Sequence, residues 1–144
     1  MFMAFEAAFA DSSFLCALVA KQDFAHAAAL WAFVELTRAG RPILTTDYVI
    51  DEALTLTKVR ANAGVSLALL DRIEQSHNLL CEFITPARFT VAKSFFRKHS
   101  DHGYSFTDCT SFVIMRELGL NEALTTDRHF FEAGFRMLLP TQAK

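Results

Sequence analysis

Short apolar runs alternate along the chain with longer amphipathic segments. The apolar runs predict strands over residues 5–10, 42–45, 79–84, 123–125 and 135–138. Strands that alternate with helical patterns are typical of an α/β fold whose sheet is mainly parallel. We therefore expect a central sheet of four to five strands, covered by helices.

The segments between these runs have the spacing and the capping residues of helices. They predict helices over about residues 12–20, 23–38, 46–60, 65–76, 86–96 and 107–118. A hydroxyl or carboxyl residue, or a proline, stands near most of the expected starts, as helix N-termini prefer. In the second helix, the spacing predicts a buried face that is formed by Phe24, Ala28, Trp31, Val34 and Leu36.

Four acidic residues stand where an ionised group is costly to remove from water. Asp11 follows the first predicted strand and Asp127 follows the fourth, while Asp108 lies in the first turn of a helix and Glu52 lies within another. In open α/β sheets, ligands bind outside the carboxyl ends of the strands, where the strand order reverses. If the first and fourth strands are neighbours, all four acids meet at this edge.

A divalent cation would neutralise such a cluster. No lysine or arginine stands one helical turn from Asp11 or Glu52. Sites rich in carboxylate oxygens suit Mg²⁺ or Mn²⁺, and metals held in this way support phosphodiester hydrolysis. We expect Asp11 and Asp108 to ligate the principal metal. Glu52 and Asp127 would bind a second ion, or hold the attacking water and accept its proton.

Each acid taken alone also has an ordinary structural interpretation. Asp11 could cap the following helix, and Asp108 could be a helix-start acid that the helix dipole stabilises. Glu52 could pair with a neighbouring helix, and Asp127 could form an Asx-turn. These interpretations lose force together, because independent caps have no reason to converge on one crevice.

Composition and charge narrow the class of protein. A length of 144 residues suits one domain, and 52% hydrophobic residues with 15 Phe predict a well-buried globular protein. The net charge of −2 argues against a uniformly basic nucleic-acid binder. Three cysteines without a paired spacing favour a reducing cytoplasm. No apolar run approaches the roughly 18 residues needed to span a membrane, and the start lacks a signal peptide's basic region.

Basic residues and histidines are less informative. Arg116 and Arg128 lie closest to the acids in sequence and are candidates for phosphate contact. Lys58 and Arg60 end a predicted helix and could also contact RNA phosphates, although a solvated face is their more ordinary role. The histidines have no metal-ligand spacing and are interpreted as surface or core residues, at positions His26, His77, His99, His102 and His129.

The acids and their neighbours match a known family. The matching segments are 9–15 (FADSSFL), 49–52 (VIDE), 104–112 (YSFTDCTSF) and 123–130 (ALTTDRHF). In these segments, and over essentially its whole length, the chain resembles PIN-domain proteins, especially the bacterial VapC-type ribonucleases of toxin–antitoxin pairs. Thr107 precedes Asp108, where a subset of the family has asparagine, so that subset's tRNA target is not carried over.

The resemblance implies a single PIN-like nuclease domain over residues 1–144, with a three-layer α/β/α sandwich. It implies Mg²⁺- or Mn²⁺-dependent endoribonuclease activity, with the four acids at the site. Hydroxyls beside these acids would help position water or metal, and they match Ser12, Ser105 or Thr107, and Thr126. An RNA substrate and an antitoxin partner follow, and the high Phe content motivates a homodimer.

Three alternatives remain open from sequence. They are a related nuclease that acts on DNA or flap structures, a catalytically silent RNA-binding PIN-like module, and a stand-alone PIN ribonuclease without an antitoxin. The near-neutral charge argues against the first, and retention of all four acids argues against the second.

Overall fold

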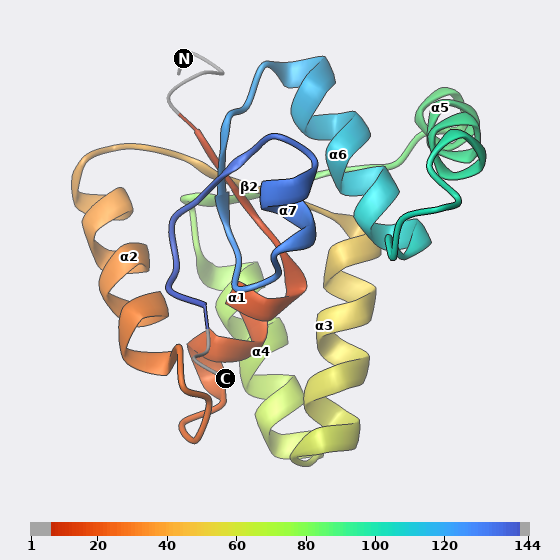
Figure 1. Cartoon of the computed structure of the whole chain (residues 1–144). Coiled ribbons are helices and arrows are strands. Elements are labelled where there is room, and N and C mark those ends of the chain that lie inside the picture. Colours follow the sequence, from red (N-terminus) through yellow and green to blue (C-terminus); the bar gives the residue numbers. More distant parts are fainter. Residues whose placement is uncertain (1–6, 142–144) are drawn as a thin grey trace.

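The computed structural model describes residues 7–141 and contains one parallel sheet (Figure 1). The strand order is β3-β2-β1-β4-β5, and every neighbouring pair is parallel. The strands are β1 (Ala8–Ala10), β2 (Ile43–Thr46), β3 (Leu79–Glu82), β4 (Glu122–Leu124) and β5 (Arg136–Met137). This confirms the predicted α/β class with a parallel five-stranded sheet.

Helices flank the sheet in two groups. They are α1 (Ser12–Val19), α2 (His26–Arg38), α3 (Asp47–Arg60), α4 (Ala63–Gln75), α5 (Pro86–Lys98), α6 (Phe106–Leu118) and α7 (His129–Glu132). Helix α1 contacts α2, α3 and α4, while α6 contacts α5 and α7 (Figure 1). Because parallel crossovers are right-handed, the reversal of chain direction after β3 places the second group on the opposite face. The layers form the expected α/β/α sandwich.

The strand order reverses between β1 and β4. The chain moves outward from β1 to β2 and β3, and then returns past β1 to β4. Phe9 pairs with Ala123 and Ala10 with Leu124, and the Asp11 amide donates to the Leu124 carbonyl at 3.1 Å. The prediction that the first and fourth strands are neighbours is confirmed. The carboxyl ends of β1 and β4 therefore form the crevice in which a ligand is expected.

Helix α2 departs from the prediction in its start and in its buried face. It begins at His26, because the Asp23 carboxylate accepts a hydrogen bond from the Ala25 amide and forms a turn first. The predicted face was wrong at three positions, since Trp31 is 68% exposed and Phe24 and Val34 are also exposed. Leu36 is buried as predicted and Ala28 packs against the core, but the other buried residues of α2 are Ala29 and Ala32. Small side chains on this face allow the helix to lie close to α1.

Other boundaries differ by a few residues. The first strand was predicted to begin at residue 5, but residues 5 and 6 lie outside the described part of the chain. The short helix α7 was not predicted, because four residues are too few for a recognisable periodicity. No described helix has both the length and the apolar character that a membrane span requires.

The core between the sheet and α6 depends on aromatic packing. Phe112 is fully buried, and its ring contacts Tyr104, Phe130 and Phe135 at centroid separations of 5.0, 5.0 and 5.8 Å. Phe130 in turn stacks on Phe9 of β1 at 6.4 Å. Since Tyr104 and Phe130 flank the segments that carry Asp108 and Asp127, this core also sets the position of the crevice.

The substitution Phe112→Ala tests this dependence. We expect it to lower the free energy of unfolding by about 3–5 kcal/mol, through lost burial and a residual cavity. The matched control is Phe131→Ala, because Phe131 is 61% exposed on α7 and should tolerate truncation. Urea denaturation of both variants gives the comparison. Equal losses of stability would contradict the packing described.

Candidate active site

Asp11 lies at the carboxyl end of β1 and is held by two hydroxyls. Its side chain is only 3% exposed. Thr125 Oγ1 donates to Asp11 Oδ2 at 2.9 Å, and Ser13 Oγ donates to the same oxygen at 3.2 Å. Asp11 occupies the N-cap position of α1 but makes no side-chain capping bond. The capping interpretation therefore does not describe the Asp11 carboxylate.

The same two hydroxyls connect Asp11 to the segment after β4. Thr125 Oγ1 accepts a hydrogen bond from the Asp127 amide at 2.9 Å, and Ser13 Oγ accepts one from the Thr126 amide at 3.0 Å. The two hydroxyl oxygens lie 3.2 Å apart. This pair fixes the separation of Asp11 and Asp127, which come from neighbouring strands.

Asp108 is both a helix-start acid and a site residue. Its Oδ2 accepts a hydrogen bond from the Ser105 amide at 3.0 Å, and its own amide donates to Ser105 Oγ at 3.0 Å. These bonds form a capping box at the N-terminus of α6. They engage Oδ2 and leave Oδ1 available for a ligand. The ordinary interpretation of Asp108 is thus confirmed, and it is compatible with a role in the crevice.

Asp127 and His129 come from the segment that follows β4. Asp127 Oδ1 accepts a hydrogen bond from the His129 amide at 2.9 Å, which is the predicted Asx-turn. His129 Nδ1 lies 3.3 Å from both Asp108 Oδ2 and Asp127 Oδ1, without the alignment of a hydrogen bond. The ring contacts Tyr104 edge-on, and a side chain at Gly103 would meet its Nε2. His129 is therefore fixed between two aspartates.

Glu52 approaches from α3. Its Oε1 accepts a hydrogen bond from Ser12 Oγ at 2.5 Å, which joins α3 to the first residue of α1. Its negative charge contributes to raising the pKa of Asp108. Its neighbour Asp51 is exposed. Of the two adjacent acids on α3, Glu52 is the one that belongs to the crevice.

The electrostatics of the crevice leave negative charge uncompensated. Burial raises the pKa of Asp11 from 3.8 to about 7, although the Thr125 hydrogen bond opposes this, and the charges of Asp108 and Asp127 raise it further. Burial also raises the pKa of Asp108. Within residues 7–141, no lysine or arginine forms a salt bridge with any of the four acids.

The donor atoms of the crevice fit a divalent cation. Asp108, Asp127 and His129 each offer one ligand atom, and these atoms all lie within 4.8 Å of one another. Asp11 and Glu52 stand outside that tight group, and they are linked to it by charge and by the hydroxyl contacts. Carboxylate oxygens are the ligands that Mg²⁺ and Mn²⁺ prefer, and imidazole nitrogen is compatible with Mn²⁺-type sites.

Some predicted site residues lie elsewhere or act through the backbone. Thr126 contributes its amide, and Thr107 contributes its carbonyl to Thr110 Oγ1. Arg128 lies over the Phe131 ring at 5.7 Å. Arg116 donates to the Ala133 carbonyl at 3.4 Å and lies over Phe95. Arg116 follows Asp108 by eight residues of α6, which is about 12 Å of helix.

Sequence reasoning missed three residues of the crevice. Ser13 and Thr125 stand next to predicted site residues, so their hydroxyls were visible, but their pairing depends on the register of β1 and β4. His129 was set aside because it lacks metal-ligand spacing. Its position two residues after Asp127, at the start of α7, was the available signal.

Comparisons with known proteins agree with the fold. The model of the PIN domain family matches residues 8–136. The chain is 32% identical over 136 residues to the 23S rRNA-specific endonuclease VapC20 of Mycobacterium tuberculosis, covering 92% of this chain and 98% of the relative. The crystal structure of that sarcin–ricin loop cleaving toxin superposes with a TM-score of 0.81 at 30% identity, covering 93% of this chain and 100% of the other.

A more distant solved structure shows the same fold. FitAcB from Neisseria gonorrhoeae has a TM-score of 0.57 at 14% sequence identity, and the match covers 90% of this chain and 94% of that one. At this identity the likeness concerns the fold alone.

The pKa of Asp11 predicts how stability depends on pH without metal. Because the folded-state pKa, about 7, lies above the ordinary 3.8, the folded protein binds a proton more tightly than the unfolded chain. Stability from this group is greatest below about pH 4 and is lost as pH rises through 7. In EDTA at pH 8, Asp11→Asn should be more stable than wild type, by up to about 4 kcal/mol.

Urea unfolding of both proteins between pH 4 and pH 8 measures this difference. The gap between variant and wild type should widen with rising pH. A variant that is less stable than wild type at pH 8 would contradict the desolvated state of Asp11.

Proposed function

The chain belongs to the PIN domain family, and on that basis we propose that it is a divalent-metal-dependent endoribonuclease. The observation that carries the proposal is that four acids converge on the crevice where the strand order reverses. These acids are Asp11, Glu52, Asp108 and Asp127. A relative named as an endonuclease shares this fold over nearly its whole length. We propose that the cation is Mg²⁺ or Mn²⁺.

The residues of the crevice divide into those that hold the cation and those that handle the proton. Asp11, Asp108 and Asp127 would hold the metal, together with His129. When bound, the metal supplies charge stabilisation to the phosphorane-like transition state and lowers the pKa of the attacking water. Glu52, which stands outside the tight group of donor atoms, would accept the proton of this water.

The hydroxyls keep the acids in place. Ser13 and Thr125 both donate to Asp11 Oδ2, which orients Oδ1 toward the crevice. Ser12 holds Glu52 through its Oε1. These contacts fix the carboxylates before substrate arrives, and preorganised groups contribute most to the stabilisation of a transition state.

We propose ribosomal RNA as the first substrate to test. The relative from Mycobacterium tuberculosis is named as specific for 23S rRNA and as cleaving the sarcin–ricin loop. The resemblance to VapC-type proteins supports a toxin that an antitoxin protein restrains, acting in the cytoplasm where ribosomes are found. A stand-alone ribonuclease is the alternative. A small antitoxin gene next to this one, whose product abolishes the cleavage, distinguishes the two.

Purified protein with Mg²⁺ or Mn²⁺ should cleave total RNA, and EDTA should stop the cleavage. Asp11→Asn and Asp108→Asn should each lower kcat/KM by about 100-fold or more, because several kcal/mol of charge stabilisation disappears. The matched control for Glu52→Gln is Asp51→Asn, because Asp51 is the exposed acid next to Glu52 on the same helix. Primer extension across the ribosomal RNA measures the cut. Cleavage that survives EDTA, or that is equal in the two aspartate variants and wild type, contradicts the proposal.

We also propose that a second copy of the chain covers the α5 surface, defined as Phe83, Phe89 and Phe96. All three side chains are exposed, and the rings of Phe89 and Phe96 both contact Phe106. Helix α5 buries only Ala92, and β3 beside it is an edge strand. Exposed apolar side chains gathered in this way are typical of interaction surfaces.

Phe96→Glu should shift the protein from dimer to monomer, because a carboxylate would be desolvated in the interface. The matched control is Val59→Glu on α3, where the valine is 78% exposed and lies outside the α5 surface. Sedimentation velocity at high micromolar concentration measures the mass. A monomeric wild type, or equal masses for the two variants, would exclude this dimer.

A further inference from the structure

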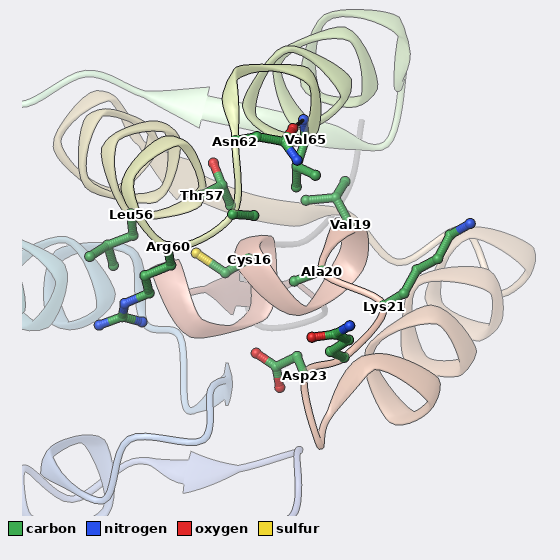
Figure 2. Close-up of a pocket in the computed structure, with 12 residues that line it drawn as sticks. Cys16, Val19, Ala20, Lys21, Asp23, Leu56, Thr57, Arg60, Asn62 and Val65 are labelled. Atoms are coloured by element: carbon green, nitrogen blue, oxygen red, sulfur yellow. Dashed lines mark hydrogen bonds between the residues drawn. The ribbon is translucent and has the colours of Figure 1, made fainter.

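A pocket lies between α1, α3 and α4, outside the acid crevice (Figure 2). Its volume is about 620 Å³, which is within the range of small-ligand sites. Cys16, Val19, Leu56 and Val65 supply apolar lining. Figure 2 shows Arg60 beside Leu56 and Cys16 at one end, while Lys21 stands at the other. The pocket is thus apolar within and basic at both ends.

The pocket follows the contact between Ser12 and Glu52 along α1 and α3. Cys16 is one helical turn after Ser12 on α1, and Leu56 is one turn after Glu52 on α3. Residues four apart lie on the same face of a helix, and Ser12 Oγ bonds Glu52 Oε1 at 2.5 Å. Along both helices, the contact between Ser12 and Glu52 therefore comes first, and the pocket residues Cys16 and Leu56 follow about 6 Å further along the helix axis.

Arg60 lines the same pocket. It lies on α3 one turn after Leu56 and two turns after Glu52, and helical side chains tilt toward the N-terminus of their helix, which is the end that carries Glu52. Arg60 is exposed, and the salt bridges among residues 7–141 do not include it. Burial raises the pKa of the Cys16 thiol to about 11, and the positive charge of Arg60 opposes this rise. A guanidinium without a salt-bridge partner in this part of the chain, beside a pocket with apolar lining, suits a phosphate.

We propose that this pocket receives the nucleotide one position beyond the two that flank the scissile phosphate, with Arg60 on its backbone phosphate and its base against Leu56 and Val65. This inference rests on the proposed ribonuclease function. Proteins that read RNA take single-stranded or looped nucleotides whose bases can be splayed out of the stack. A base-sized pocket one turn from the acids therefore selects loop RNA over a regular duplex.

The charge of the lining favours RNA over an acidic or apolar peptide. Arg60 and Lys21 are basic, and the one acid among the lining residues, Asp23, is engaged by the Ala25 amide at 2.9 Å. A peptide that filled the pocket would gain apolar burial but would leave both cations without a partner. A polyanion satisfies the cations and places its base in the apolar part.

The charge test compares Arg60→Gln with Lys58→Gln, since both residues are exposed in the last turn of α3 and only Arg60 lines the pocket. On a loop RNA that the wild type cleaves, Arg60→Gln should raise KM about tenfold with little change in kcat. It should also reduce the salt slope of log kcat/KM by about 1, as expected when one phosphate contact is lost. Lys58→Gln should match wild type.

The pocket test compares Val65→Trp with Leu67→Trp, two indoles on the same helix. Val65 lines the pocket, whereas Leu67 is 60% exposed and lies outside it. The substrates are a dinucleotide with one scissile bond and longer RNAs that extend it on either side. Val65→Trp should raise KM for RNAs extended on one side and leave cleavage of the dinucleotide unchanged. Thermal melts confirm that both variants are folded.

The outcomes separate this inference from the function on which it rests. A wild type that cleaves no RNA overturns both. A wild type that cleaves RNA, with Arg60→Gln equal to Lys58→Gln, overturns the pocket assignment alone, as does equal loss on the dinucleotide and the longer RNAs. If Val65→Trp does not fold, the comparison of Arg60→Gln with Lys58→Gln decides, because those side chains are exposed.

Discussion

The burial of one carboxylate, Asp11, is the constraint on which the site depends. A strand end at the centre of a parallel sheet is among the driest places in an α/β domain, and an ionised group there is costly unless it is neutralised. Two hydroxyls lower this cost without removing it, and the nearby acids add to it. A divalent cation would resolve the conflict, and the same cation would supply the proposed chemistry.

The fold supplies this constraint through its strand order. With β1 beside β4, the chain brings Asp11 and Asp127 to one edge, although they are far apart in sequence. The capping box of α6 then aims Asp108 at that edge, and the Ser12–Glu52 contact brings in α3. The groups that stabilise these elements are therefore the same as the candidate site residues, so the capping role of Asp108 and the Asx-turn of Asp127 are compatible with the proposed functional role.

Much of this arrangement could be predicted from sequence. The strands and the positions of the four acids follow from local patterns, because a strand end and a helix start have recognisable residues. The Ser13–Thr125 pair could not be predicted, since it depends on strand register. The buried face of α2 could not be predicted either. The close approach of α1 decides that Ala32 is buried while Trp31 is exposed. The position of His129 could not be predicted either, because the turn after β4 places its ring near Asp108 and Asp127.

The central claim is that the crevice acids hold a divalent cation, and calorimetric titration of the RNA-free protein with Mn²⁺ tests it most directly. The account predicts saturable binding by wild type that weakens at least about tenfold in both Asp11→Asn and Asp108→Asn, since each removes a charged ligand from a dry site. Asp51→Asn should bind as wild type does. Absent binding, or the same affinity in all four proteins, would contradict the account.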